Sequence, residues 1–335
     1  MNQRIITVFG GSGFLGRFIV KRLCLCGWKV RVAVRGHEAA QFLKPMGSPG
    51  QIIIWQTDVM NEKQVESAIQ GAHSVINLVG ILYQTGRNTF KDIHCHATEN
   101  IAKAAQSAGV EMFIHVSALG ANIRSESAYA RTKAEGEIKA RQFFPNLIVF
   151  RPSVIFGPED NFFNMFASIS RFLPVLPIYG CKNFPEIKLT KESGFVVNFC
   201  GDGGTKFQPV YAGDVAEAIV KCLGKSEFMG GTFELGGPKT YNFKDLINLV
   251  LKIINRKRLL IPIPFRIAMI QAFFLQFLPK PILTCDQVRL LNEHNVVQSG
   301  SLTFKDLGIE PSVAEIVLPT YLKRFKRNSI GLDSF

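Results

Sequence analysis

Short runs of apolar residues alternate, over the first half of the chain, with segments in which apolar residues recur every three or four positions. The short runs have the length and β-branched content of buried strands, and the segments between them have the period of amphipathic helices. Regular alternation of strand and helix predicts an α/β fold with a doubly wound parallel sheet of the Rossmann type. The predicted strands span 5–9, 29–34, 52–55, 74–79, 112–117 and 147–151, and the predicted helices include 14–26, 62–69 and 90–109.

This alternation becomes irregular after residue 157, where Pro, Gly and Phe become frequent. We therefore expect two domains, a NAD(P)-binding Rossmann domain over 1–157 and a smaller, partly discontinuous substrate-side lobe over 158–335. Within the lobe, residues 181–200 have the pattern of an inserted hairpin or loop. An apolar stretch at 259–283 is interrupted by prolines and polar residues, so it does not predict a membrane-spanning helix.

The apolar stretch 259–283 has two interpretations. Its residues 265–278 are apolar almost all round, as a helix buried in the core of the lobe would be. The same pattern suits a docking helix that meets a membrane interface or an apolar partner, with basic flanking residues near anionic headgroups. Those flanking residues are Arg256, Lys257, Arg258 and Lys280. The net charge of +13 favours the docking interpretation.

Composition narrows the compartment and the partners. The 335 residues are 47% hydrophobic and 19% charged, which is typical of a globular protein. The seven cysteines are scattered and form no C-x-x-C pair, so we expect reduced thiols, a reducing compartment and no metal site. A strongly basic chain suits an anionic membrane surface or an acidic partner. Nucleic acid is disfavoured, because the dense basic run at 321–327 belongs to no recognisable nucleic-acid module.

The run FGGSGFLGR, residues 9–17, joins the first predicted strand to the first predicted helix. Gly10, Gly13 and Gly16 lie where a dinucleotide-binding turn needs a tight bend, close approach to a pyrophosphate, and close packing of helix on strand. The N-terminus of the helix then offers unpaired N–H groups and a partial positive charge to the phosphates. The sequence therefore predicts a dinucleotide site, whose turn residues are Gly10, Gly11, Ser12, Gly13, Phe14, Leu15, Gly16 and Arg17.

The residue that ends the second strand decides between NAD and NADP. An NAD site usually has Asp or Glu there to hold the ribose hydroxyls, but this chain has Arg35. A guanidinium grips a 2′-phosphate with charge-assisted hydrogen bonds, and Arg17 can add to that grip. We therefore predict NADPH (or NADP+) as the cofactor. Further predicted contacts at strand ends are Asp58 and Val59 at the adenine, and Asn77, Val79 and Gly80 at the adenosine ribose.

Tyr129 and Lys133 are four residues apart on a predicted helix, so they share one face of it. An ammonium beside a phenol lowers the phenol's pKa, which is one way to build a proton donor and acceptor near neutral pH. Such a pair normally works with a hydroxyl at the end of the preceding strand, where this chain has Ser117 followed by Ala118. Tyr129, Lys133 and Ser117 are therefore the candidate catalytic residues.

Over about residues 4–237 the chain resembles the extended short-chain dehydrogenase/reductases. The motifs that carry this resemblance are, in chain order, GxxGxxG, the strand-ending Asp58, NLVG, Y-x-x-x-K and RPSVIFGP. The segments KFQPVYAGDVAEAI, TFELGGP and LGIEPSVAEIVLPTYLKRF also resemble the subfamily of the nucleotide-binding accessory subunit of respiratory complex I and its bacterial relatives. The resemblance implies a bound, largely static NADPH. It also implies that Tyr129 and Lys133 hold the nicotinamide ribose, with Ser117, Pro152 and Val154 also at the cofactor.

The strand end departs from the pattern of active extended members. Those members have two successive hydroxyl residues there, the second of which polarises the substrate, and this chain has Ala118 in the second place. Successive strand residues face opposite sides, so Ser117 does not simply replace it. The loss of one such donor typically costs about a hundred- to a thousandfold in rate. We therefore favour a vestigial rather than an active catalytic pair.

These arguments predict an NADPH-binding accessory or assembly factor of a quinone-linked respiratory membrane complex, with NADPH bound and largely not turned over. One alternative is an NADP(H)-dependent reductase, epimerase or dehydratase that acts in quinone biosynthesis or on a nucleotide sugar. Another is a regulator that senses the NADP(H) redox state. We expect a cytoplasmic protein, peripheral at the inner membrane in a bacterium, or on the matrix side of the inner membrane in an organelle.

Overall fold

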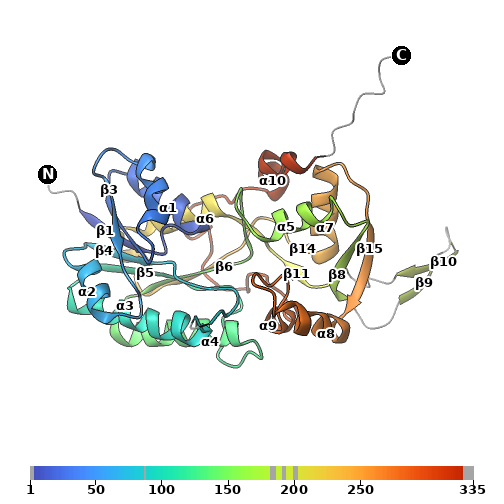
Figure 1. Ribbon diagram of the computed structural model, residues 1–335, viewed down its shortest axis with the longest axis horizontal. Helices are drawn as coiled ribbons and strands as arrows, with labels where there is room; N and C mark the ends of the chain where they lie inside the picture. The colour runs from blue at the N-terminus through green and yellow to red at the C-terminus, as the bar shows by residue number, and fades with distance from the viewer. Residues whose placement is uncertain (1–3, 87, 182–185, 191–193, 199–202, 327–335) are drawn as a thin grey trace, which may run out of the picture. The chain divides into compact units, whose positions relative to one another are not determined.

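The computed structural model describes residues 4–86, 88–181, 186–190, 194–198 and 203–326 (Figure 1). The chain divides into two compact units. Unit 1 comprises Met1–Ser153, Ala212–Gly236 and Val297–Pro311, and unit 2 comprises Val154–Tyr211, Gly237–Val296 and Ser312–Phe335. The first boundary thus falls at Ser153 rather than at 157. Two segments that the sequence pattern places in the second lobe, 212–236 and 297–311, belong to unit 1.

Unit 1 is built on a sheet that has seven strands in the described part of the chain, and every neighbouring pair is parallel. The strand order reverses between β1 and β4, which is where sheets of this kind bind ligands at the carboxyl ends of their strands. The order is β3-β2-β1-β4-β5-β6-β13, with β1 (Ile5–Phe9), β2 (Lys29–Val34), β3 (Ile52–Gln56), β4 (Ser74–Asn77), β5 (Met112–Val116), β6 (Ile148–Pro152) and β13 (Thr232–Leu235). The predicted doubly wound parallel sheet is confirmed.

Helices cover both faces of this sheet (Figure 1). On one face α1 (Phe14–Leu25) packs beside α6 (Ala212–Cys222), and on the other α3 (Ala97–Ser107) packs against both α2 (Glu62–Ile69) and α4 (Ala128–Phe143). A 3-10 helix, Glu38–Met46, also packs on α1. Because α6 packs on α1 and β13 extends the sheet beyond β6, segment 212–236 completes unit 1. The predicted helix 90–109 begins as a π-helix, Lys91–His96, before α3.

Unit 2 consists of short strand pairs and helices around a core rich in Phe. Its longest pair is the parallel ribbon of β8 (Val175–Cys181) and β15 (Leu259–Pro264). Shorter pairs are β7 (Ile155–Phe156) with β12 (Val210–Tyr211), and β11 (Lys206–Phe207) with β14 (Tyr241–Asn242). The helices are α5 (Phe162–Ile169), α7 (Phe243–Ile253), α8 (Phe265–Leu275), α9 (Cys285–Leu290) and α10 (Ala314–Leu322).

The insertion predicted at 181–200 contains an antiparallel hairpin of β9 (Glu186–Thr190) and β10 (Gly194–Asn198). Its residues 182–185, 191–193, 199 and 200 lie outside the described residues. The apolar stretch 259–283 forms β15 and then α8 instead of one long helix. Among the helices that the structure describes, none combines the length and the apolar character needed to cross a membrane.

Candidate dinucleotide site

The turn between β1 and α1 depends on glycine at two points. Gly10 has a φ of +76°, which L side chains rarely adopt, and a Cβ there would lie 3.2 Å from the carbonyl carbon of Leu78. A Cβ on Gly16 would lie 2.5 Å from the carbonyl oxygens of Gly10 and Gly11, so any larger residue would push α1 away from the turn. The backbone N–H of Gly10 also donates to Ala33 O of β2 at 3.4 Å, which holds the turn at the switch point of the sheet.

The start of α1 is arranged for an anion. Gly13 is its N-cap and provides no side-chain hydrogen bond to the first-turn N–H groups. Those groups and the helix dipole then favour a phosphate at this position. The neighbouring residues shape the turn: Leu15 is buried beneath it, and Phe14 packs edge-to-face on Phe18 with ring centres 5.9 Å apart. The glycine turn has no room for Cβ atoms at Gly10 and Gly16, and the helix start beside it has no side-chain cap. This arrangement fits the pyrophosphate of a dinucleotide.

Two cations lie near this turn. Arg35 is exposed just beyond β2, and its Nη1 donates to Asn88 Oδ1 at 3.2 Å, which leaves further N–H donors of the guanidinium for a ligand. Arg17 donates from Nε to Ser12 O at 3.3 Å, and its guanidinium carbon lies 4.4 Å from the ring centre of Phe42. Arg17 is thus held by its own turn and a stacked ring, whereas Arg35 stands at the strand end where the sequence places it.

The predicted contact residues at the ends of β3 and β4 differ in burial and in hydrogen bonding. Asp58 is exposed, and its Oδ1 accepts from the N–H of Met60 at 3.0 Å, while Val59 is buried. The Asn77 side chain is fully buried and bonds within the protein: Nδ2 donates to Thr98 Oγ1 at 3.3 Å, and Oδ1 accepts from Val79 N at 2.9 Å. The Asn77 side chain therefore links β4 to α3 and holds the turn 78–80.

Lys133 of α4 lies buried against the ends of β4 and β5. Its Nζ donates to Val116 O at 3.3 Å, and a Cβ on Gly80 would lie only 2.9 Å from Nζ, so glycine at 80 permits this approach. Burial lowers the pKa of Lys133 from 10.5 to about 8, and burial raises the pKa of Tyr129 to about 12. The sequence argument, in which the ammonium lowers the phenol's pKa, is wrong for this geometry because desolvation of the phenolate outweighs that attraction.

Lys133→Met is expected to stabilise nucleotide-free protein by about 1–3 kcal/mol at pH 7 and to weaken nucleotide binding. The folded-state pKa of Lys133, about 8, lies below the unfolded value of 10.5, so the unfolded chain binds more protons between those values. The unfolding free energy of the unmutated protein should therefore rise with pH across that window relative to the variant. Urea unfolding at several pH values measures the slope, and Lys139→Met on the same helix is the control. Equal slopes for all three proteins would contradict the prediction.

Ser117 follows β5 and carries an unsatisfied hydroxyl. Its side chain is 4% exposed, and its Oγ has no hydrogen-bond partner among the residues that the structure describes. A buried hydroxyl without a partner costs free energy, so the geometry fits a ligand atom there. Ala118 beside it is partly buried and has no polar side-chain atom. This strand end thus carries the Ser117 hydroxyl alone, whereas active extended members have two successive hydroxyls there.

His94 is a site residue that the sequence reasoning missed. Its Nδ1 lies 3.0 Å from Thr132 Oγ1, and its Nε2 accepts from the N–H of Ile81 at 3.2 Å. Its ring meets Tyr129 edge-to-face at 5.3 Å, and burial lowers its pKa to about 2, so it is neutral. His94 therefore ties the segment after β4 to α4 and packs against Tyr129. It lies in the π-helix Lys91–His96. Because a π-helix has more residues per turn than an α-helix, the α-helical period does not predict the side on which His94 lies.

A buried ion network, also missed, braces α4. Arg151 of β6 binds Glu137 through Nε–Oε1 at 3.0 Å and Nη2–Oε2 at 2.6 Å, and Arg151 Nη1 lies 3.9 Å from Glu234 Oε1. Both glutamates are 5% exposed. Glu234 also accepts from Gln298 N at 2.9 Å. The network joins the helix of Tyr129 and Lys133 to β6 and β13, so residues far apart along the chain position the site.

The last two predicted contact residues lie where unit 1 ends and unit 2 begins along the chain. Pro152 is buried at the end of β6, and its carbonyl accepts from Leu119 N at 3.0 Å. Val154 is the first residue of unit 2. The structure therefore places every predicted cofactor residue except Val154 within unit 1. Within the described residues, no three His, Cys, Asp or Glu side chains are grouped to bind a metal ion.

Comparison with known proteins gives relatives over nearly the whole chain. A family model, that of the 3-beta hydroxysteroid dehydrogenase/isomerase family, matches residues 7–130. The chain is 34% identical over 322 residues to NADH dehydrogenase (ubiquinone) 1 alpha subcomplex subunit 9 of Arabidopsis thaliana, covering 92% of this chain and 74% of that protein. The same subunit of Mus musculus is 33% identical, covering 96% and 80%. Ceramide reductase of Caulobacter vibrioides is 29% identical over 197 residues, covering 58% and 61%.

Solved structures share the fold. The NADPH-dependent quinone oxidoreductase of Escherichia coli in complex with NADPH has a TM-score of 0.71 at 17% identity, covering 95% of this chain and 99% of that chain. A dTDP-glucose 4,6-dehydratase of Streptomyces venezuelae with NAD bound has a TM-score of 0.68 at 17% identity, covering 96% of each chain. The fold seen here is thus one that carries either nicotinamide dinucleotide in other proteins.

Proposed function

The chain belongs to the family of NADH dehydrogenase (ubiquinone) 1 alpha subcomplex subunit 9, and from this membership we propose that it is an NADPH-binding accessory or assembly protein of a quinone-linked respiratory membrane complex. Its NADPH is bound and largely not turned over. The observation that carries the choice of NADPH is Arg35, which stands at the carboxyl end of β2 next to the glycine turn. A guanidinium at that place suits a 2′-phosphate, and a carboxylate would repel it.

In this proposal, different residues of the chain bind different parts of the dinucleotide. The turn Gly10–Gly16 and the start of α1 hold the pyrophosphate, with Arg35 and Arg17 at the 2′-phosphate. Asp58 and Val59 meet the adenine, and the backbone at 79–80 meets its ribose. Tyr129 and Lys133 hold the nicotinamide ribose, with Ser117, Pro152 and Val154 close to the ring. The bound nucleotide would supply hydride chemistry.

Three features support storage of the nucleotide over turnover. Ala118 offers no hydroxyl to polarise a substrate. Burial raises the pKa of Tyr129 to about 12, so the phenolate that forms when Tyr129 gives up its proton is disfavoured in this site. The ring of His94, with its pKa lowered to about 2, packs on Tyr129 as a neutral group and cannot help by becoming charged. Together they leave the site able to bind a dinucleotide but poorly equipped to move a proton.

The alternative function is an NADP(H)-dependent carbonyl reductase. Tyr129, Lys133 and a buried Ser117 hydroxyl are all present, and one relative is a ceramide reductase. In that case Tyr129 would donate the proton to the carbonyl oxygen, and Lys133 would assist by lowering the phenol's pKa once the nucleotide is bound. Epimerase or dehydratase chemistry on a nucleotide sugar and redox sensing remain further alternatives that the same residues would serve.

Tyr129→Phe separates these functions. We expect the variant to retain NADPH with an affinity within about tenfold of the unmutated protein, because the phenol contributes at most one neutral hydrogen bond of about 0.5–1.5 kcal/mol. Nucleotide released from purified protein by denaturation, then separated and quantified, measures the occupancy. Oxidation of NADPH by the unmutated protein with ketone or quinone acceptors, abolished in Tyr129→Phe, would instead establish the reductase.

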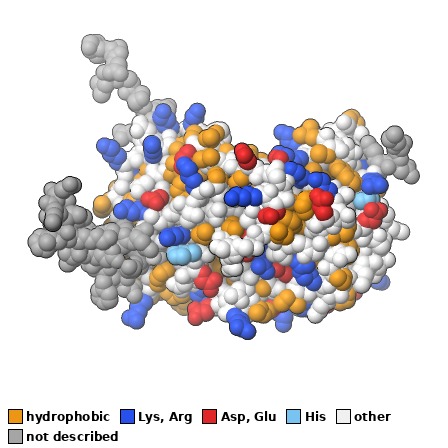
Figure 2. All heavy atoms as spheres, turned by 180° about the vertical axis from the view of Figure 1, so that it is seen from behind, with side chains coloured by type: hydrophobic (Ala, Val, Ile, Leu, Met, Phe, Trp, Pro, Cys, Tyr) orange, Lys and Arg blue, Asp and Glu red, His pale blue; other side chains and the backbone are white. Residues whose placement is uncertain are grey.

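The proposed partner is a respiratory membrane complex, or an anionic membrane surface beside it. The proposed location is the cytoplasmic face of a bacterial inner membrane, or the matrix face in an organelle. On the face of the molecule shown in Figure 2, Lys and Arg side chains are dispersed among apolar and acidic ones. A pull-down from solubilised membranes tests the partner: co-purification of respiratory-chain subunits supports the proposal, and their absence at full NADPH occupancy would refute it.

A further inference from the structure

Helix α8 buries small residues and exposes several large apolar ones. Its two buried residues are the small Ala268 and Ala272, both 0% exposed and one turn apart. Phe265, Met269 and Leu275 pack partly buried around these alanines, but other large apolar side chains point outward: Ile270 is 61% exposed and Phe274 is 68% exposed. Exposed apolar residues continue along and beyond the helix at Ile267, Phe273, Phe277, Leu278 and Ile282. A surface helix of a globular protein normally buries its large apolar side chains, but the part of the chain that the structure describes leaves this face uncovered.

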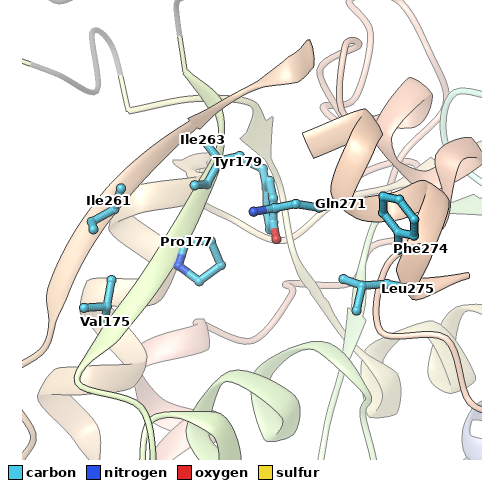
Figure 3. Close-up of a pocket in the computed structure, with 8 residues that line it drawn as sticks. All are labelled: Val175, Pro177, Tyr179, Ile261, Ile263, Gln271, Phe274 and Leu275. Carbon is cyan, nitrogen blue, oxygen red and sulfur yellow. The ribbon is translucent and has the colours of Figure 1, made fainter. Parts of the chain in front are cut away.

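The β8–β15 ribbon has the same character beside α8. Leu176 and Ile178 on one face of the ribbon are fully buried in the core of unit 2. The alternate residues face a groove of about 560 Å³ that separates the ribbon from α8. Figure 3 shows the groove residues Val175, Pro177, Tyr179, Ile261, Ile263, Gln271, Phe274 and Leu275. The α8 surface is defined here as this groove together with the exposed residues of 267–282.

The basic residues around the α8 surface favour an anionic partner. Residues 246–285 contain no Asp or Glu but six basic residues, namely Lys252, Arg256, Lys257, Arg258, Arg266 and Lys280. Arg266 and Lys280, which bracket the apolar face of α8, are both exposed. A second copy docked through the same face would bring these cations together, which is unfavourable. An apolar face bracketed by the exposed cations Arg266 and Lys280 matches the acyl region and the headgroups of an anionic bilayer.

We propose that the α8 surface docks on an anionic phospholipid bilayer, with α8 in the interface and its phenylalanines among the upper acyl chains. Phe273 is already arranged for this, because its ring packs edge-to-face on Phe274 at 5.5 Å and on Phe277 at 5.6 Å. The cluster therefore loses little conformational freedom when it inserts. This inference adds a direct lipid contact to the membrane partner of the proposed function, and it requires neither NADPH nor a respiratory complex.

Vesicle co-sedimentation tests the contact with full-length protein. We expect binding to vesicles of phosphatidylcholine and phosphatidylglycerol, and a fall in the partition coefficient of about tenfold or more for Phe273→Glu/Phe277→Glu. The matched control is Leu25→Glu/Ile316→Glu, which replaces two residues that are 78% and 71% exposed and makes the same change in charge. Equal loss in both double variants, or none in either, would overturn the proposal.

A second experiment tests whether α8 inserts into the bilayer, as distinct from binding to its charged surface. In Phe274→Trp, phospholipids brominated on their acyl chains should quench the added indole fluorescence, whereas Leu25→Trp should be unaffected. The native Trp28 and Trp55 provide the background, which is measured in the unmutated protein. Binding of Phe274→Trp without quenching of its added indole, or equal binding to pure phosphatidylcholine, would overturn the proposal. A dimer in vesicle-free solution that Phe273→Glu/Phe277→Glu dissociates would also overturn it, because a second copy would then cover the surface.

Failure of this inference is distinguishable from failure of the proposed function. Arg35→Asp should leave vesicle binding unchanged, and Phe273→Glu/Phe277→Glu should leave NADPH occupancy unchanged, because the substituted residues belong to different units. Protein that binds vesicles but contains no NADPH refutes the nucleotide proposal alone. Protein that carries NADPH and co-purifies with respiratory-chain subunits, yet does not sediment with anionic vesicles, refutes the lipid contact alone.

Discussion

Arg35→Asp is expected to weaken NADPH binding about 100- to 1,000-fold and to change NADH affinity by no more than about threefold. Charge-assisted hydrogen bonds are worth about 1.5–3 kcal/mol each, and the new carboxylate would repel the 2′-phosphate that the guanidinium attracts. The same carboxylate accepts a hydrogen bond from the 2′-hydroxyl of NADH, as in NAD-binding sites. Titration of nucleotide-free protein with each dinucleotide, followed by fluorescence or calorimetry, measures both affinities.

A matched control separates the local contact from the general attraction of a basic protein for an anion. Lys21→Asp makes the same change in charge at an exposed position in the second half of α1. It should lower NADPH affinity by no more than about threefold, because solvent screens a distant surface charge at physiological salt. If the affinities for NADPH and NADH fall together in Arg35→Asp, or neither changes, Arg35 does not contact the 2′-phosphate and the choice of NADPH loses its support.

Arg151→Met is expected to lower the unfolding free energy of unit 1 by about 3–5 kcal/mol. It leaves Glu137 and Glu234 as buried carboxylates without their cation, and both side chains are less than a tenth exposed. Urea unfolding monitored by intrinsic fluorescence measures the effect, because both tryptophans, Trp28 and Trp55, lie in unit 1. Because the network braces α4, the variant should also bind NADPH more weakly.

The control is another Arg→Met change in an ion pair. Arg22 binds Glu217 at 2.9 Å, but the two side chains are 38% and 42% exposed, so Arg22→Met should cost less than about 1 kcal/mol. Adding Glu137→Gln to Arg151→Met should recover part of the loss, because a neutral amide is cheaper to bury than an unpaired carboxylate. Equal losses in Arg151→Met and Arg22→Met would mean that burial does not set the strength of the network.

The strand-and-helix order of unit 1 could be predicted because each segment carries its own signal. Gly10 and Gly16, for example, follow an apolar strand and open a helix at fixed spacing, and the positive φ of Gly10 and the contact of Gly16 with the carbonyls of Gly10 and Gly11 are local requirements for glycine. The position of Arg35 at the end of β2 could be predicted for the same reason. The role of His94 could not be predicted, because the π-helix changes the side on which this residue lies. The Arg151 network could not be predicted either, because its three members come from separate elements.

By itself, the sequence determined the parallel sheet, the glycine turn and the cation at the end of β2, since these depend on neighbours within a few residues. It left open whether 259–283 is core or surface, because hydrophobicity reports the need for burial and not the side on which burial occurs. The tertiary structure decided that point: Ala268 and Ala272 face the protein, and Phe273, Phe274 and Phe277 face out. It also decided the state of Tyr129 and Lys133, since desolvation depends on elements that only folding brings around them.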